Sequence, residues 1–92
     1  MWSIVEARDV AKTLAKAEPR IADQYEFWKA VVRISGPHAL RALRGMNDEA
    51  LAGQWKGFRS SRLSGQWRVI YRVESREVAV YVVRVSAHDY RR

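Results

Sequence analysis

Residues 58–86 read FRSSRLSGQWRVIYRVESREVAVYVVRVS, and this stretch decides the fold. Its apolar residues recur largely at every second position, which is the period of a strand that buries one face. Two short polar breaks, SG at residues 64–65 and ESR at residues 74–76, have the length and composition of hairpin turns. The stretch therefore predicts an antiparallel meander with strands over residues 58–63, 66–74 and 77–86.

The middle and last strands of this meander have faces of different character. In the middle strand one face is apolar and contains Trp67, Val69, Tyr71 and Val73. The other face contains Arg68, Ile70, Arg72 and Glu74. In the last strand one side contains Val78, Val80 and Val82, and the opposite side is partly apolar through Val83 and Val85. We expect helices to cover one sheet face and the arginine-bearing face to stay open.

The N-terminal half of the chain predicts the covering helices. Residues 2–6 favour a first strand, and residues 8–17 have apolar side chains at helical spacing. Proline is tolerated in the first turn of a helix, so a second helix begins at Pro19 and runs to about residue 35, where Gly36 and Pro37 stop it. Its apolar residues form one stripe with a spacing of 4, 3 and 4: Ile21, Tyr25, Trp28 and Val32. Residues 38–44 predict a short helical piece, and residues 45–56 an irregular segment. The sequence predicts an α+β fold with an N-terminal strand, a helical hairpin and a C-terminal three-stranded antiparallel meander.

Length and composition exclude several classes of protein. A chain of 92 residues forms one domain, residues 1–92. It has no cysteine, and His38 and His88 are fifty residues apart, so we expect no disulfide, no metal site and no cofactor. No apolar run reaches the roughly 18 residues of a membrane span, and the N-terminus lacks a secretory signal. We expect a soluble cytoplasmic protein.

The charge is strongly basic and unevenly distributed. The chain has 17 Lys and Arg against 10 Asp and Glu, a net charge of +7. Residues 1–52 carry eight basic and seven acidic side chains, whereas residues 53–92 carry nine basic and three acidic ones, a net charge of +6. Eight of those nine are arginines, whose planar donors suit phosphate oxygens. A polyanion is therefore the expected partner.

The predicted sheet gathers groups that suit the cleavage of RNA. Arg62, Arg68 and Arg72 fall on the open face, and the last strand ends just before His88, Asp89 and Tyr90. Cleavage by the neighbouring 2′-hydroxyl requires removal of its proton, stabilisation of the phosphorane and protonation of the leaving 5′-oxygen. Cationic donors, an imidazole, a carboxylate and a phenol supply these functions, and an aromatic ring can stack on an unpaired base.

Three stretches carry a resemblance to a known family: LAG at residues 51–53, RLSGQWRVIY at residues 62–71 and HDY at residues 88–90. Together with the valine-rich last strand they resemble the RelE/ParE superfamily, the toxins of bacterial type II toxin–antitoxin systems. The resemblance covers essentially the whole chain, because the order of strand, helical hairpin and meander also follows the family. It implies ribosome-dependent cleavage of mRNA in the A site for the RelE, YoeB, HigB and YafQ branches, and gyrase poisoning for the ParE branch.

The resemblance also implies roles for individual residues. Arg68 matches an arginine that contacts the scissile phosphate, and Arg62 lies near a basic position where RelE has lysines. His88 falls where some branches place a general acid, and Tyr90 resembles a tyrosine that stacks on an mRNA base. The double lysine of RelE is absent, so the general base is either Asp89 or is replaced by charge stabilisation alone. The further RNA contacts expected are Lys56, Arg59, Arg72, Arg91 and Arg92.

The expected function is that of a toxin and endoribonuclease (mRNA interferase) that inhibits translation and growth. Its products would be a 2′,3′-cyclic phosphate and a 5′-hydroxyl. The expected partners are the ribosome, mRNA and a cognate antitoxin, through which the complex would bind operator DNA. The alternatives are a non-enzymatic DNA gyrase inhibitor of the ParE type and a nucleic-acid-binding module without toxicity.

Overall fold

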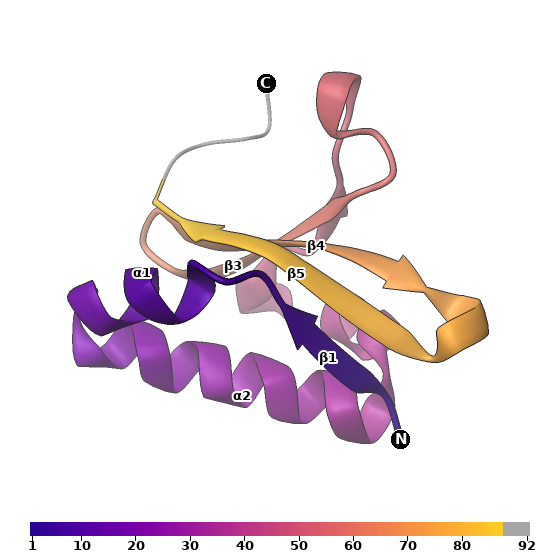
Figure 1. The fold of residues 1–92 in the computed structure, drawn as a ribbon, viewed down its shortest axis with the longest axis horizontal. Helices are drawn as coiled ribbons and strands as arrows, with labels where there is room; N and C mark the ends of the chain where they lie inside the picture. The colour runs from indigo at the N-terminus through magenta and orange to yellow at the C-terminus, as the bar shows by residue number, and fades with distance from the viewer. Residues whose placement is uncertain (88–92) are drawn as a thin grey trace.

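Helices and sheet form two layers in the computed structural model, which describes residues 1–87 (Figure 1). The strands are β1 (Ser3–Glu6), β2 (Glu49–Ala50), β3 (Arg59–Ser64), β4 (Trp67–Glu74) and β5 (Ala79–Ser86). The helices α1 (Val10–Lys16) and α2 (Pro19–Ser35) both lie on one face of the sheet. The predicted α+β fold, with a helical hairpin on one sheet face, is confirmed.

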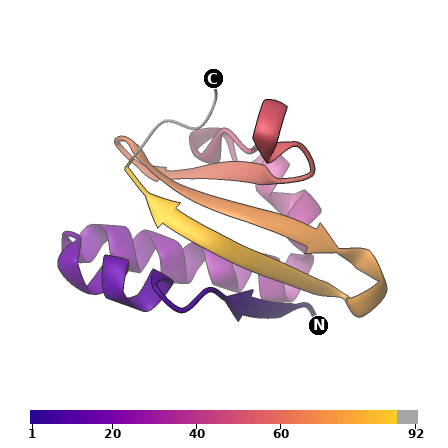
Figure 2. The same ribbon diagram turned by 45° about the horizontal axis from the view of Figure 1, so that its top comes forward.

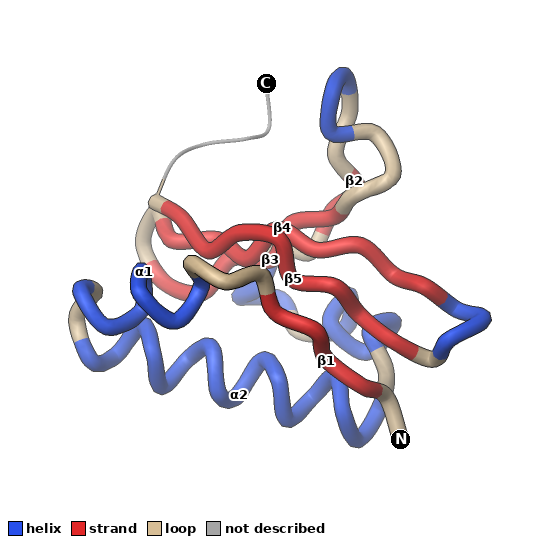
Figure 3. Tube along the Cα trace, in the orientation of Figure 1, coloured by secondary structure: helices blue, strands red, loops and turns tan. Residues whose placement is uncertain are grey.

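The five strands follow the order β1-β5-β4-β3-β2 across the sheet within residues 1–87 (Figure 3). β3, β4 and β5 form the predicted antiparallel meander. β1 lies parallel to β5, with Ile4 opposite Val80. Figure 2 shows β1 and the segment around residue 50 at opposite edges of the sheet. The crossover from β1 to the meander is made by the two helices, which are thereby held against the same face.

The core lies between α2 and the inner face of the meander. The predicted apolar stripe of α2 is fully buried and contains Ile21, Tyr25, Trp28 and Val32. Trp28 stacks on Tyr25 with ring centroids 5.9 Å apart and meets Tyr71 of β4 edge to face at 5.2 Å. Aromatic pairs of this kind contribute about 1 kcal/mol beyond their buried area. The helical spacing read from the sequence therefore identifies the face that holds the sheet.

Gly36 ends α2 and also makes room for the start of β1. Its φ is +85°, a backbone conformation that residues other than glycine rarely adopt. Its N–H donates a hydrogen bond to the carbonyl oxygen of Val32 at 2.9 Å. A Cβ at this position would lie 2.9 Å from Nε1 of Trp2. Trp2 therefore packs directly over the helix end, which ties the first strand to the second helix.

The prediction for the last strand is wrong in two details. Residues 75–77 form a 3₁₀ turn, η4 (Ser75–Glu77), so the strand begins at Ala79. A β-bulge follows, because Ile70 pairs with Arg84 and Tyr71 with Val82, which leaves Val83 as an extra residue. The bulge reverses the alternation, so Val85 lies on the same inner face as Val82 and is buried. The apolar character of both sides in the sequence reflects this bulge.

The connection between α2 and β3 contains more regular structure than the sequence indicates. Three 3₁₀ helices lie there: η1 (Pro37–Ala42), η2 (Arg44–Met46) and η3 (Gly53–Trp55). η1 corresponds to the short helical piece predicted over residues 38–44. The segment over residues 45–56, predicted to be irregular, contains β2, in which Glu49 lies opposite Ser60 and Ala50 opposite Arg59. Among residues 1–87 no helix is long and apolar enough to cross a membrane.

The sheet face away from the helices is not open at its centre, contrary to the prediction. Ser60 and Ile70 are fully buried there, and Arg68 is only 5 % exposed. The chain leading into β2 accounts for part of this burial, because Asn47 and Glu49 come within hydrogen-bonding reach of the Arg68 guanidinium. Arg68 is therefore held in a polar enclosure and is not a solvated strand arginine.

Candidate active site

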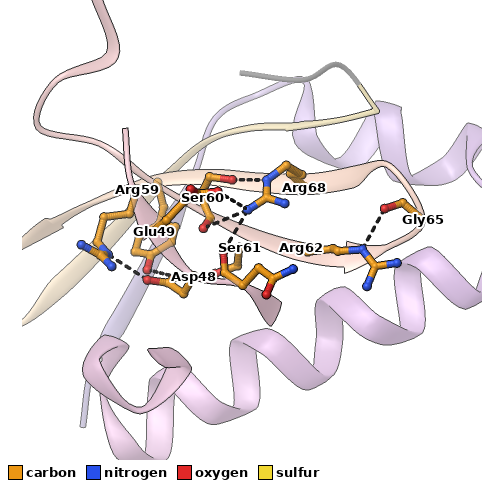
Figure 4. A network of polar contacts seen from close by, with 10 residues as sticks. Asp48, Glu49, Arg59, Ser60, Ser61, Arg62, Gly65 and Arg68 are labelled. Atoms are coloured by element: carbon orange, nitrogen blue, oxygen red, sulfur yellow. Dashed lines mark hydrogen bonds and ion pairs between the residues drawn. The ribbon is translucent and has the colours of Figure 1, made fainter. Parts of the chain in front are cut away.

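Arg68 is the centre of a polar cluster at the start of β4 (Figure 4). Its Nε donates a hydrogen bond to the Ser60 hydroxyl. Its Nη2 lies 3.1 Å from the carbonyl oxygen of Asn47 and 3.4 Å from a carboxylate oxygen of Glu49. These contacts come from β3 and from the segment that enters β2, so tertiary structure fixes the orientation of the guanidinium. A cation held in this way stabilises developing negative charge without reorganising.

Glu49 is the residue of this cluster that sequence reasoning missed. Its pairing with Ser60 places it on the same side of the sheet as Arg68, and its side chain is 43 % exposed. The separation of 3.4 Å from the guanidinium is longer than the roughly 2.8 Å of a tight ion pair. The carboxylate is therefore next to a fixed cation and still accessible to solvent. Because it is accessible, the Glu49 carboxylate can accept a proton from a group bound beside Arg68.

Asp48 anchors the same segment on the opposite side of the sheet. Its side chain is fully buried and accepts hydrogen bonds from Arg59 Nε at 2.8 Å, from Ser61 Oγ at 2.6 Å and from the Tyr71 hydroxyl. Burial and the bond to Asp48 raise the pKa of Tyr71 far above its usual value, so the hydroxyl remains a donor. Asp48 and Glu49 thus contact opposite sides of the sheet (Figure 4).

Arg59 belongs to the Asp48 cluster and not to the Arg68 cluster. It lies opposite Tyr71 on the helix-covered side, with its side chain 20 % exposed. Burial lowers the pKa of Arg59, but the hydrogen bond and the charge of Asp48 outweigh this and raise it overall. Arg59 and Arg68 therefore lie on different sides of the sheet. The phosphate contact predicted for Arg59 stays a prediction.

Arg62 lies directly opposite Arg68 in the β3–β4 register, so the two arginines share one face of the sheet. Its Nε donates to the carbonyl oxygen of Gly65 at 2.9 Å, which holds the guanidinium at the hairpin turn. Two cations at directly opposed positions repel one another and cost stability. Arg62 and Arg68 therefore place two positive charges on the outer face of the β3–β4 hairpin.

The other basic residues predicted to bind RNA form two groups: those within residues 1–87 and those outside the described residues. Arg72 pairs with Glu74 at 2.8 Å and covers the ring of Tyr81, and Lys56 is exposed just after η3. The remaining predicted site residues are His88, Asp89, Tyr90, Arg91 and Arg92, and they lie outside the described residues. Ser86 is opposite Arg68, so the last described strand ends beside the cluster.

Within residues 1–87 no group of His, Asp and Glu side chains is arranged to hold a metal ion. His38 is an exposed surface residue of η1. The polar cluster brings together Glu49, Arg62 and Arg68, which are groups for acid–base and electrostatic chemistry.

Solved structures that superpose on this chain include toxins and toxin–antitoxin complexes. YafQ from E. coli superposes with a TM-score of 0.71 at 17 % identity, covering 94 % of this chain and 92 % of its own. RelE in the RelE–RelB complex of Pyrococcus horikoshii gives 0.74 at 15 % identity, covering 92 % of each chain. The toxin–antitoxin complex RelBE2 of Mycobacterium tuberculosis gives 0.58 at 26 % identity, covering 92 % and 88 %. Neither a protein-family model nor a curated protein matches the sequence.

These matches define the class of protein at the level of fold. The chain has the fold of the RelE-like toxins over nearly its whole described length, which confirms the resemblance found in the sequence. At these identities the similarity concerns architecture. The assignment of activity depends on the residues around Arg68.

Proposed function

We propose that this chain is the toxin of a bacterial type II toxin–antitoxin system and acts as a ribosome-dependent endoribonuclease on mRNA in the A site. The observation that carries the proposal is the buried Arg68 with the partly exposed Glu49 beside it, next to the end of β5 on a RelE-like fold. The site would operate in the cytoplasm, where ribosomes translate. The net charge of +6 over residues 53–92 supports binding to a nucleic-acid surface.

The proposed reaction begins with deprotonation of the 2′-hydroxyl by Glu49. The 2′-oxygen then attacks the adjacent phosphorus, and the phosphorane gains negative charge between Arg68 and Arg62. His88 protonates the leaving 5′-oxygen, so the products are a 2′,3′-cyclic phosphate and a 5′-hydroxyl. Tyr90 stacks on a substrate base. Asp89 is the alternative base, and Lys56, Arg59, Arg72, Arg91 and Arg92 are proposed contacts to the RNA backbone.

A cognate antitoxin is the second proposed partner. The structures similar to this chain include toxin–antitoxin complexes, such as RelBE2 of Mycobacterium tuberculosis. A basic toxin surface favours acidic side chains in the antitoxin segment that covers it. We expect such a segment to pair a carboxylate with Arg62 or Arg68, and the complex to bind operator DNA through the antitoxin.

The proposal is tested by cell-free translation of a defined message followed by primer extension. Wild type is expected to cut within codons only while the message is translated, and Arg68→Ala is expected to abolish the cuts. Arg76→Ala is a matched control, because it removes an exposed arginine from the η4 turn at the far end of β4. An intact message with inhibited gyrase supercoiling would contradict the proposal and support the ParE-type alternative.

A further inference from the structure

A groove of about 390 Å³ opens beside Arg62, outside the Arg68 cluster. One wall is α2, which contributes Phe27, and the other is formed by η2 and the end of β3. The floor is apolar and consists of Leu43, Met46 and Leu63. Leu63 and Met46 are nearly buried, so they belong to the edge of the core and hold the groove in shape. The groove is thus a built feature of the fold.

Phe27 is an unusual residue to leave in solvent. It is 53 % exposed, although the buried side of the same helix supplies the core. Ile34, two turns further along α2 on the same side, is 76 % exposed. Phe27 lines the groove and Ile34 lies outside its lining on the same side of α2, and exposed apolar side chains beside an apolar groove favour a surface that another molecule covers. The exposed face of α2 therefore indicates a protein partner and not RNA, whose backbone is charged.

The rim of the groove is cationic. Arg44 and Arg62 line it. Arg20, which also pairs with Glu18 at 2.9 Å, reaches its end by donating from Nη1 to Ser64 Oγ at 2.6 Å. Among residues 1–87, no Asp or Glu lines the groove. A partner that complements the apolar floor and the cationic rim of this groove is a segment with a large apolar side chain flanked by carboxylates.

We propose that this groove is the docking site of the antitoxin, which inserts an apolar anchor against Phe27 and places carboxylates on Arg44 and Arg62. This inference rests on the proposed function and adds the location and chemistry of the contact. Because Arg62 lies opposite Arg68, a segment seated in the groove also restricts access to the cluster. Arg62 therefore links docking of the antitoxin to neutralisation of the toxin.

The test uses the full chain and the protein encoded beside it, with the dissociation constant measured by calorimetry. Phe27→Ser is expected to raise Kd at least about tenfold, because a buried aromatic anchor carries much of the binding energy at an interface. Arg44→Gln is expected to weaken binding less and to reduce its dependence on salt. Val5→Ser is the matched control, because Val5 is 46 % exposed on β1 at the other edge of the sheet. Thermal melts establish that each variant is folded.

The outcomes distinguish a failure of the proposed docking site from a failure of the proposed function. Phe27→Ser is expected to cut mRNA as the wild type does and to escape neutralisation in cells that produce both proteins. An unchanged Kd for Phe27→Ser would overturn the groove while leaving the toxin–antitoxin assignment intact. Self-association of the free chain that Phe27→Ser abolishes would instead assign the groove to a second copy. Failure of the neighbouring protein to bind the wild-type chain would overturn both proposals.

Discussion

At the scale of single residues, the account depends on how Arg68 is held. A guanidinium bonded to a hydroxyl and a backbone carbonyl cannot be replaced by an ammonium, which lacks the planar fork. We predict that Arg68→Lys lowers the cleavage rate on ribosomes about 100-fold or more, while binding to ribosomes changes little. The measurement is a single-turnover rate beside a binding curve. Arg76→Lys serves as the control, and an equal loss in both variants would contradict a specific role for Arg68.

Glu49 provides the second prediction at this scale. Glu49→Gln keeps the size of the side chain but replaces one carboxylate oxygen with an NH₂ group and removes the base. We expect the cleavage rate to fall about 100-fold to 10,000-fold, which is the usual contribution of a general base. Because the side chain is 43 % exposed, the melting temperature should be nearly unchanged. An unaltered rate would move the role of base to Asp89, which Asp89→Asn would then test.

Arg68 and Glu49 also show what a sequence reveals about a site. Arg68 was found because strand alternation and the resemblance both single it out. The burial of Arg68 was not predicted, because strand alternation distinguishes the two faces of a sheet and does not say what covers them. Glu49 was missed because its proximity to Arg68 depends on a two-residue strand that has no periodicity to detect. His88, Asp89 and Tyr90 lie outside the described residues, so their roles stay predictions.

At the scale of elements, the segment that enters β2 is the part of the fold on which the site depends. Both oxygens of Asp48 are used: one accepts from Arg59 and the other from Ser61 and Tyr71. An asparagine would present an NH₂ group to one of these donor sets. We predict that Asp48→Asn lowers the free energy of unfolding by about 3 kcal/mol, measured by denaturant titration.

For Asp48→Asn, a control variant and a second measurement distinguish an effect on the position of Glu49 from an effect on the stability of the fold. Asp23→Asn, on the exposed side of α2, is expected to leave the unfolding free energy within about 0.5 kcal/mol of wild type. At a temperature where both variants are folded, Asp48→Asn should also cut more slowly, because Glu49 is no longer held beside Arg68. Full stability in Asp48→Asn would show that the buried network is not the anchor.

The elements were predicted where local signals agree and missed where tertiary contacts decide. Pro19, the 4-3-4 spacing of apolar residues and Gly36 together define α2, and the alternating pattern defines the meander. The bulge at Val83 was missed because valines on both sides of a strand are equally consistent with a strand that buries both faces. The parallel pairing of β1 with β5 is a long-range contact, which local patterns do not specify.

At the scale of the whole molecule, two buried tyrosines make stability depend on alkaline pH. Burial and the hydrogen bond to Glu6 raise the pKa of Tyr25 far above 10, and burial and Asp48 do the same for Tyr71. Above pH 10 the unfolded chain loses these protons while the folded chain keeps them, so the unfolded state is favoured. We predict that the free energy of unfolding is lost as the pH rises above about 10.

The same linkage predicts which substitution flattens the pH dependence. Tyr25→Phe removes one of the two buried phenols, so the loss of stability above pH 10 should become shallower. The measurement is denaturant unfolding at pH values on either side of 10 for both proteins. An identical slope in the two proteins would contradict the assignment of this dependence to the buried hydroxyl.

The central claim is that the Arg68 and Glu49 site on this RelE-like fold cuts mRNA on the ribosome. The most direct measurement is a single-turnover reaction on purified ribosomes with a defined codon in the A site, followed by analysis of the product ends. The account predicts a 2′,3′-cyclic phosphate and a 5′-hydroxyl within that codon. It also predicts a cleavage rate about 100-fold or more lower in Arg68→Lys and Glu49→Gln. Equal cleavage of free RNA, or an intact codon under these conditions, would contradict it.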